Sequence, residues 1–362
     1  MVFRKLSGGE NMGAWESYVR RVVPYVPGEQ PARKDIIKLN TNENPYPPCP
    51  AVVEALRNMD VDGLRRYPAP DTEPLRTALA DTYGLKPQQV FVGVGSDDVL
   101  AMCFLTFFQS DRPVLFPDIT YSFYDVWAEL FRISYQRIPL DEAFRIRPDD
   151  YRRENGGVIF PNPNAPTGEL LPIEQAEEII RSNPDSVVIV DEAYIDFGGD
   201  SVLPLLDRYD NLLVVQTFSK SRSLAGLRIG YAMGSERMIR YLEDVKYSFN
   251  SYTMNAAALK LGTAALSDPA YYKETSRKII ATREKTAGSL RALGFTVPAS
   301  SSNFLFVTHP TADIPELFEA LKRDGIYVRH WNKPRIDRHL RITIGTDEEM
   351  ERLVDWLKEY LS

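Results

Sequence analysis

Short apolar runs recur along the middle of the chain, and polar residues follow most of them. The runs are rich in Val, Ile, Leu and Phe and are too short for helices, a pattern typical of buried parallel strands. They occupy residues 90–94, 113–116, 157–160, 186–190 and 212–215. A helical pattern, IEQAEEIIRS, separates two of the runs. Strands that alternate with helices predict an α/β fold with a mostly parallel central sheet and helices on both faces.

The last third of the chain has a different pattern. Residues 255–293 are expected to form long helix, which Gly294 would end. Strand patterns follow at SNFLFVT, GIYVRH and HLRITIG, with helical patterns at 312–324 and 347–361. This mixture predicts a second, smaller α+β domain.

The chain has 362 residues, which is long enough for more than one domain. Residues 24–50 are rich in Pro and Asn and are expected to form an irregular arm. We divide the chain into an N-terminal arm with part of the small domain (1–45), a large domain (46–270) and a small C-terminal domain (271–362).

Charge and composition exclude several classes of protein. Lys plus Arg total 43 and Asp plus Glu total 50, so the net charge is −7, and no basic cluster favours a nucleic-acid partner. Cys49 and Cys103 are too few for a disulfide framework, and no cysteine near the three histidines would complete a zinc site. We expect no secretory signal at the start of the sequence, because it has no apolar segment, and apolar runs such as 99–108 are about half as long as a membrane span. We therefore expect a cytoplasmic protein without a metal, a membrane or a nucleic acid as partner.

Polar groups follow four of the predicted strands at their carboxyl ends, which is where open α/β sheets bind ligands. GSDD follows the first strand, PNPNAPTG the third, DEAY the fourth and QTFSK the fifth. Hydroxyls, amides, carboxylates, a phenol and a lysine are therefore expected at one edge of the sheet.

Lys220 and Asp191 are the candidates for chemistry at this edge. A lysine beside a buried strand can attack a carbonyl when nearby cations, here Arg222 and Arg228, favour its neutral amine. A buried carboxylate such as Asp191 requires a partner, and a protonated heteroaromatic nitrogen would serve. Two plainer interpretations stay open at this point: a surface lysine, and a carboxylate that caps the next segment.

Residues 95–98 open a predicted helix after a glycine-rich turn. Free backbone N–H groups at such a terminus bind phosphate, and Ser96 would add a hydroxyl. The dinucleotide-binding fingerprint fails because position 98 is Asp98 rather than Gly, and no Walker A lysine is present. An ordinary helix start capped by Asp97 or Asp98 explains the same residues.

Three more side chains have two interpretations each. Tyr121 follows the second strand and either stacks on a ring or belongs to the core. Arg341 lies between apolar residues in HLRITIG, and Arg329 lies in YVRH. Each arginine either binds a substrate carboxylate with its planar fork or forms a salt bridge within the small domain.

Three motifs, taken in order, resemble those of the fold-type I pyridoxal-phosphate-dependent aminotransferases. They are NPNAPTG at 162–168, DEAY at 191–194 and SKSRSLAGLR at 219–228. PYVPG, LNTNENPYPP, RYP and RITIGT are further similar to the histidinol-phosphate aminotransferases of that family. The resemblance covers nearly the whole chain. It implies the type I transferase fold, pyridoxal 5'-phosphate as the cofactor and a homodimer.

The resemblance also implies a role for individual residues. Lys220 would form the Schiff base and carry the proton, while Asp191 would face the pyridinium nitrogen and Tyr194 the ring hydroxyl. The other cofactor-binding residues would be Ser96, Asp97, Tyr121, Thr217, Ser219 and Arg228, together with Tyr67, which would reach the phosphate in the neighbouring subunit. The substrate would be bound by Tyr25, Arg329 and Arg341.

One position departs from the family pattern. The family often has Asn directly before Pro-Thr-Gly, where it donates to the ring hydroxyl, and here that residue is Ala165. Asn162 or Asn164 would supply the amide instead, although a shift of one residue points a side chain elsewhere. Loss of this donor is expected to change the pKa of the Schiff base more than to abolish catalysis, because Tyr194 remains.

The implied reaction is transamination between L-histidinol phosphate and 2-oxoglutarate in histidine biosynthesis, which gives imidazole-acetol phosphate and L-glutamate. Two alternatives keep the same fold: an aromatic-amino-acid aminotransferase and a phosphothreonine decarboxylase. A non-enzymatic sensor, like the aminotransferase-like half of certain transcription regulators, is disfavoured because no basic helical unit lies ahead of the first motifs.

Overall fold

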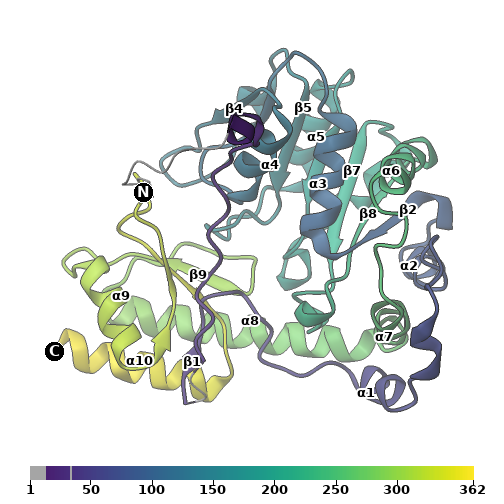
Figure 1. The fold of residues 1–362 in the computed structure, drawn as a ribbon. Coiled ribbons are helices and arrows are strands. Elements are labelled where there is room, and N and C mark those ends of the chain that lie inside the picture. The colour runs from purple at the N-terminus through teal and green to yellow at the C-terminus, as the bar shows by residue number, and fades with distance from the viewer. Residues whose placement is uncertain (1–13, 33–34) are drawn as a thin grey trace.

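The computed structural model describes residues 14–32 and 35–362 (Figure 1). The expectation that the chain starts without a secretory signal concerns residues 1–13, which lie outside the described residues. A seven-stranded sheet forms the centre of the large domain. In order across the sheet, its strands are β2 (Val90–Gly93), β8 (Gly230–Gly234), β7 (Leu212–Thr217), β6 (Val188–Asp191), β5 (Gly157–Pro161), β3 (Val114–Pro117) and β4 (Tyr135–Ile138). Only β8 runs in the opposite direction to the other strands of this sheet, so the predicted mostly parallel sheet is confirmed.

Helices cover both faces of this sheet, because successive side chains of a strand point to opposite sides. In β6, Val188 and Val190 join one hydrophobic core, whereas Ile189 joins another. The first core includes residues of α2 (Leu75–Tyr83), α5 (Ile173–Ser182) and α7 (Ala256–Leu266). The second includes residues of α3 (Gly95–Phe107), α4 (Phe123–Phe131) and α6 (Glu236–Phe249). The layers expected of an α/β fold are therefore present.

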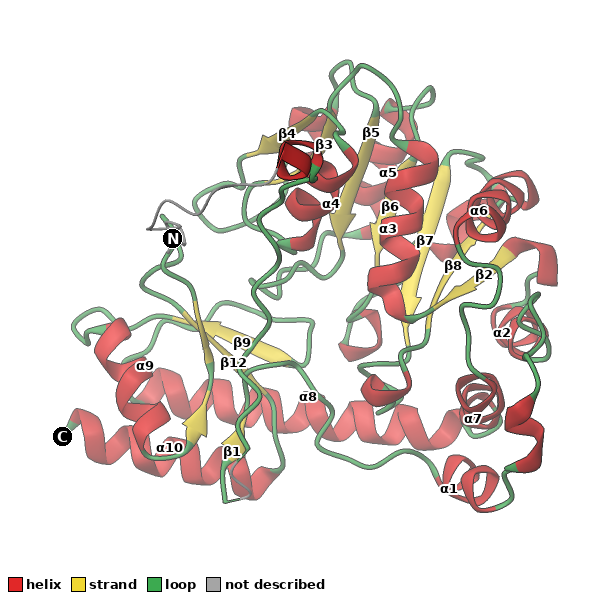
Figure 2. Ribbon diagram, viewed as in Figure 1, coloured by secondary structure: helices red, strands yellow, loops and turns green. Residues whose placement is uncertain are grey.

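The small domain has its own antiparallel sheet and its own core (Figure 2). Its strands, in order, are β11 (Arg329–His330), β12 (Leu340–Thr343) and β9 (Phe304–Val307). A separate parallel pair joins β1 (Ile37–Lys38) to β10 (Ile326–Tyr327), so a segment near the N-terminus belongs to the small domain. The helices packed here are α8 (Pro269–Ala292), α9 (Ile314–Arg323) and α10 (Asp347–Leu361).

The long helix expected over 255–293 is in fact two helices, and that expectation was wrong in this respect. Helix α7 ends at Leu266 and α8 begins at Pro269. Asp268 caps α8, because its carboxylate accepts a hydrogen bond from the backbone N–H of Tyr271. A proline has no N–H for a continuous helix but fits the first helical position, which explains the break.

The N-terminal arm connects the two domains on the outside of the molecule. Its described part begins near α4 with a short helix, η1 (Ala14–Tyr18), and runs down to β1 in the small domain (Figure 1). The guanidinium of Arg20 donates to the carbonyl of Leu130 in α4. That of Arg329 in β11 donates to the carbonyls of Val26 and Pro27 at 3.1 and 3.4 Å. The arm is thereby fastened to both domains.

The remaining elements are short. They are α1 (Pro50–Arg57) and the 3₁₀ helices η2 (Asp62–Arg65), η3 (Pro87–Gln89), η4 (Pro148–Tyr151), η5 (Ile195–Phe197), η6 (Leu203–Asp207) and η7 (Ala225–Leu227). Across residues 14–32 and 35–362, no helix combines the length and the apolar character needed to cross a membrane.

Candidate active site

A cavity of about 710 Å³ opens where the carboxyl ends of the large sheet meet the arm and the small domain. Most of the site residues proposed from the sequence line it. They are Tyr25, Ser96, Asp97, Tyr121, Asp191, Tyr194, Ser219, Lys220, Arg228, Arg329 and Arg341. The rule that ligands bind beyond the carboxyl ends of parallel strands therefore locates this cavity correctly.

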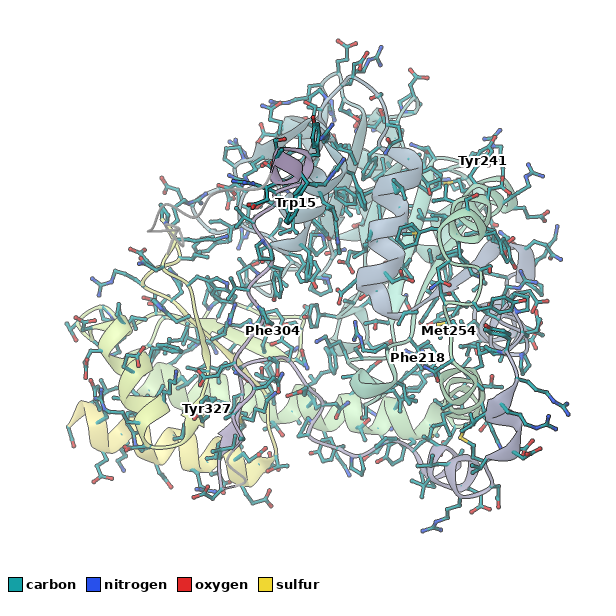
Figure 3. All side chains as sticks on the ribbon, viewed as in Figure 1. Trp15, Phe218, Tyr241, Met254, Phe304 and Tyr327 are labelled. Carbon is teal, nitrogen blue, oxygen red and sulfur yellow. The ribbon has the colours of Figure 1, made fainter. Side chains whose placement is uncertain are left out.

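Lys220 and Tyr194 lie together in the cavity. The Lys220 Nζ is 5.6 Å from the centre of the Tyr194 ring and donates a 3.4 Å hydrogen bond to the carbonyl of Thr41. Tyr194 follows β6 and packs edge-on against Phe304 of β9, with ring centres 5.2 Å apart. Figure 3 shows Phe304 where the small domain approaches the large one. An amine, a phenol and both domains thus meet at one point.

Asp191 is the last residue of β6 and is 4% exposed. One carboxylate oxygen accepts a 2.9 Å hydrogen bond from the Tyr124 hydroxyl, and the other accepts from the backbone N–H of Ala193 at 3.3 Å. Burial raises the pKa of Asp191 to about 6, although both hydrogen bonds favour the ionised form. A cation placed against this carboxylate would keep it ionised at neutral pH.

The amino end of α3 lies at another side of the cavity and has the backbone features of an anion-binding helix terminus. The first backbone N–H groups of a helix have no partners within the helix and carry a partial positive charge. Here Ser96 and Asp97 lie in the first turn, and Gly95 has φ +84°, which suits glycine. A Cβ at Gly95 would collide with the guanidinium of Arg228. The glycine therefore lets a cation approach the helix terminus closely.

Side chains around this terminus orient one another. The Arg228 guanidinium donates to an Asp97 carboxylate oxygen at 2.9 Å, and the Tyr121 hydroxyl donates to the other oxygen at 2.7 Å. Arg228 also approaches the Ser219 hydroxyl at 3.5 Å. Asp97 thus positions Arg228 and Tyr121, while its backbone stays at the helix terminus.

Arg341 and Arg329 form a second basic region on the small-domain side. Arg341 donates to the carbonyl of Asn40 at 3.0 Å, yet its buried Nε has no hydrogen-bond partner among the described residues. Desolvation lowers the pKa of Arg341, so its charge is held at a cost that an anion would offset. Tyr25 lies close enough that both arginines lower the pKa of its hydroxyl, against the larger opposite effect of burial.

Four residues proposed from the sequence do not line the cavity. Thr217 lies behind Ser219, to whose hydroxyl it donates at 3.0 Å. Tyr67 is 82% exposed, and its ring lies 4.6 Å from that of Tyr252 on the surface. The remaining two are Asn162 and Asn164.

The amides of these two asparagines are used to fold the loop after β5. Asn162 exchanges hydrogen bonds with the backbone of Leu171 at 2.8 and 3.0 Å. The Asn164 amide donates to the Ile119 carbonyl and the Thr167 hydroxyl, both at 3.0 Å. Ala165, in contrast, lines the cavity. Both amides are therefore engaged within the loop. Neither replaces the side-chain donor that the family often has at the position of Ala165.

Arg222 also lies away from the cavity, contrary to the expectation that it would act on Lys220. It is 4% exposed, pairs with Asp196 at 3.3 Å and donates to the Tyr83 hydroxyl at 3.1 Å. The charge of Arg222 is therefore balanced within a buried polar cluster behind the lysine.

Sequence reasoning missed three contributors. Asn42 donates to the Tyr194 hydroxyl at 2.8 Å, and Tyr124 supports Asp191. Trp331 lines the cavity between two arginines, whose guanidinium carbons lie 5.5 Å (Arg329) and 5.2 Å (Arg341) from its ring centre. Asn42 sits in the LNTNENPYPP motif, so only Asn42 carried a signal that could have been found.

In the described part of the chain, no group of three or more His, Cys, Asp and Glu side chains could hold a metal ion. The groups that line the cavity include an amine, a phenol, a buried carboxylate and two separate cationic regions.

A family model for class I and II aminotransferases matches residues 34–357. The chain belongs to this family. It is therefore a transaminase, with an amino donor and a 2-oxo acid as its substrates. A histidinol-phosphate aminotransferase of Pseudomonas putida is 53% identical over 343 residues, which cover 95% of this chain and 99% of the relative. One from Lactococcus lactis subsp. cremoris is 52% identical, with coverage of 96% and 98%.

Solved structures of aminotransferases have the same fold. The histidinol-phosphate aminotransferase of Sinorhizobium meliloti, solved with pyridoxal 5'-phosphate, has a TM-score of 0.82 at 24% identity and covers 90% of each chain. The enzyme of Clostridium acetobutylicum has a TM-score of 0.83 at 22% identity, covering 90% of this chain and 99% of its own. The type I transferase fold is therefore confirmed.

Proposed function

We propose that this aminotransferase uses pyridoxal 5'-phosphate to transfer the amino group of L-histidinol phosphate to 2-oxoglutarate, a step of histidine biosynthesis. One observation carries the proposal: Lys220, Asp191 and Tyr194 share one cavity with two separate cationic regions, one at Arg228 and one at Arg341. Relatives at 52–53% identity over almost the whole chain bear the name of that activity.

The residues of the cavity fit the cofactor. The terminus of α3, with Ser96, Ser219 and Arg228, suits the phosphate. The carboxylate of Asp191 is buried, so it needs a positively charged partner to stay ionised. A protonated ring nitrogen of the cofactor would provide this charge. When bound, the cofactor withdraws electrons from the substrate carbon that loses its proton.

Each residue of the chain has a task that follows from its surroundings. Lys220 would hold the cofactor covalently and, once released, carry the proton to and from the substrate. Tyr194 would donate to the ring hydroxyl, and Asp191 would keep the ring nitrogen protonated. Tyr121 would cover a ring face while its hydroxyl stays bound to Asp97.

The second cationic region would bind the anionic end of each substrate. Arg341 and Arg329 carry fixed charge on the small-domain side, and Tyr25 adds a hydroxyl. A phosphate or a carboxylate would offset the desolvation of Arg341. The same cations would therefore serve histidinol phosphate in one half of the reaction and 2-oxoglutarate in the other.

We further propose a homodimer in the cytoplasm. Tyr67 and Tyr252 are an exposed aromatic pair, 82% and 46% exposed, with ring centres 4.6 Å apart. We group them with Leu64 and Phe249, which lie close to them in sequence and are 53% and 70% exposed, as one apolar patch, and exposed apolar surface favours protein–protein contact. Tyr67 would reach the cofactor phosphate of the second subunit from this patch. The two buried free cysteines are compatible with a reducing compartment.

Two experiments test the proposed function. Borohydride reduction of the purified protein, followed by peptide mapping, should place a pyridoxyl group on Lys220, and a label elsewhere would contradict the assignment. The second experiment supplies histidinol phosphate, phenylalanine or O-phosphothreonine with 2-oxoglutarate and measures glutamate and carbon dioxide. Glutamate should form fastest with histidinol phosphate. Faster turnover of phenylalanine, or carbon dioxide from phosphothreonine, would favour the corresponding alternative.

A further inference from the structure

Asn42 is a buried residue beside Tyr194 that the reaction described above does not use. It is 2% exposed, and its side-chain Nδ2 lies 2.8 Å from the Tyr194 hydroxyl oxygen. Its backbone has φ +55°, a conformation that asparagine adopts more readily than most residues. The loop after β1 thus adopts a less common backbone shape to bring an amide to this phenol.

Two small-domain residues hold Asn42, and one of them, Thr343, contacts its side-chain amide. The Thr343 hydroxyl accepts a 3.0 Å hydrogen bond from the backbone N–H of Asn42 and donates its own hydrogen to Asn42 Oδ1 at 3.1 Å. The amide of Asn303 donates to the backbone carbonyl of Asn42 at 3.0 Å. Because Oδ1 is engaged by Thr343, the NH₂ group is the end that faces Tyr194.

This orientation decides where the hydrogen of Tyr194 points. A phenol has one hydrogen to donate and also accepts hydrogen bonds through its oxygen. Since Asn42 occupies the oxygen as a donor, the hydrogen is not used on Asn42 and is free to point into the cavity. Two asparagines line the cavity among the described residues, and the other, Asn40, donates to the carbonyl of Glu29 at 2.8 Å.

We propose that Asn42 is a positioning residue that holds Tyr194 with its hydrogen directed at the ring hydroxyl of the cofactor. It thereby compensates for Ala165, whose methyl group lines the cavity without offering a donor. The inference rests on the proposed function, because it concerns the same cofactor. It also couples the small domain to the cofactor ring, since Thr343 of β12 orients the amide.

The test is a pH titration of the visible absorption of the holoenzyme without substrate, in wild type and in two variants. Asn42→Gly removes the amide and tolerates the positive φ. Asn42→Asp keeps the shape and the Thr343 bond, but its carboxylate would capture the Tyr194 hydrogen. A hydrogen-bond donor to the ring hydroxyl of the cofactor stabilises the ionised form of that oxygen. Asn42→Gly weakens this donor, so the pH midpoint of the absorption change should rise by about 0.5–1 pH unit. The rise should be larger in Asn42→Asp.

Asn40→Asp is the matched control, because it adds the same charge to the cavity wall without touching Tyr194. Its midpoint should move less than that of Asn42→Asp. Thr343→Val, which frees the amide to rotate, should raise the midpoint by a smaller amount and keeps the test open if Asn42→Gly does not fold. The kcat with histidinol phosphate should fall about 5–20-fold in Asn42→Gly, with KM changing less.

The outcomes separate this inference from the proposed function. If the wild type binds cofactor at Lys220 and the Asn42 variants titrate within about 0.2 pH unit of it, the positioning role is refuted while the function stands. Equal shifts in Asn42→Asp and Asn40→Asp would also refute it, because they would reveal a general charge effect. A wild type without the cofactor absorption would refute the proposed function itself.

Discussion

The two walls of the cavity are built in different ways. Much of the large-domain wall consists of residues at or shortly beyond the carboxyl ends of buried strands, such as Asp191 at the end of β6 and Lys220 shortly after β7. The other wall combines the arm, with Tyr25 and Asn42, and the small domain, with Arg341. These segments lie about 300 residues apart in sequence, as the contact between Arg341 and Asn40 illustrates with a separation of 301 residues.

The difference separates chemistry from recognition. Asp191 and Lys220 are held by β6 and β7, two strands whose backbones are paired on both sides, so these reactive groups keep their places. The opposite wall supplies charge and shape, and its parts are joined by the short pairing of β1 with β10 together with side-chain hydrogen bonds and ring contacts. We therefore expect substitutions in the first wall to affect turnover and substitutions in the second to affect substrate binding.

Lys220→Ala gives the largest expected effect. The variant should still bind the cofactor without a covalent bond, because the phosphate and ring contacts remain, while kcat falls by up to about 10⁴-fold. Absorption spectra and steady-state kinetics measure the two properties. Lys86→Ala, at a lysine whose side chain is 71% exposed, is the matched control. Near-normal turnover in Lys220→Ala would show that the lysine does not take part in the reaction. It would also contradict the assignment of the chemistry to the large-domain wall.

Arg341→Lys tests the opposite wall. Lysine keeps the charge but loses the planar fork that binds carboxylate or phosphate with two hydrogen bonds. The KM for histidinol phosphate should rise about 10–100-fold, with a smaller change in kcat. A change confined to kcat would instead show that Arg341 acts in the chemical step, as we expect of residues in the large-domain wall. Arg237→Lys, at a residue on the surface of α6, controls for the substitution itself.

The sequence predicted the first wall better than the second, and the reason is physical. Strand ends can be located from apolar runs, so Asp191 and Lys220 follow from a local pattern. Asn42 depends on Thr343 and Asn303, which join it only through the parallel pairing of β1 with β10 and the sheet beside it.

The resemblance named residues on both walls but did not give their neighbours. It implied Arg341 and Arg329, yet the tryptophan between them went unnoticed. The two asparagines proposed in place of Ala165 fold their own loop, which a linear motif does not reveal. Likewise, the sequence spacing of Arg222 did not show that the turn after Lys220 directs it into a buried cluster behind the lysine.

Trp331→Leu examines how the second wall is held together. Its ring lies between the guanidinium groups of Arg329 and Arg341, and each contact at such a distance contributes about 0.5–1 kcal/mol. Loss of both should raise the KM for histidinol phosphate about 3–20-fold, less than Arg341→Lys does. Trp331→Phe keeps an aromatic face and should retain most of the affinity. If the two variants behave alike, the ring does not position the arginines.

Glu192→Gln concerns the support behind the first wall, and its effect on turnover should be the smallest. Glu192 follows Asp191 but faces away from the cavity, where its carboxylate accepts hydrogen bonds from the Val202 backbone, Ser201 and Gln216 at 2.8, 2.6 and 2.8 Å. Burial raises its pKa from 4.5 to about 7. Between pH of about 4.5 and about 7, the folded protein therefore keeps on Glu192 a proton that the unfolded chain has already released.

The sign of the effect on stability follows from this proton. Retaining it stabilises the fold fully below pH 4.5, and the advantage is lost as pH rises to about 7, so the free energy of unfolding falls across that window. Glutamine cannot ionise, so the wild type should lose on the order of 2 kcal/mol relative to Glu192→Gln between pH 5 and 8. Asp191 titrates in both proteins and cancels in the difference. Urea unfolding at several pH values measures the gap, with the exposed Glu174→Gln as the control for loss of a charge. A gap that is constant with pH would show that Glu192 is ionised in the fold, and the support behind the strand ends would then be ionic rather than a neutral hydrogen-bonded network.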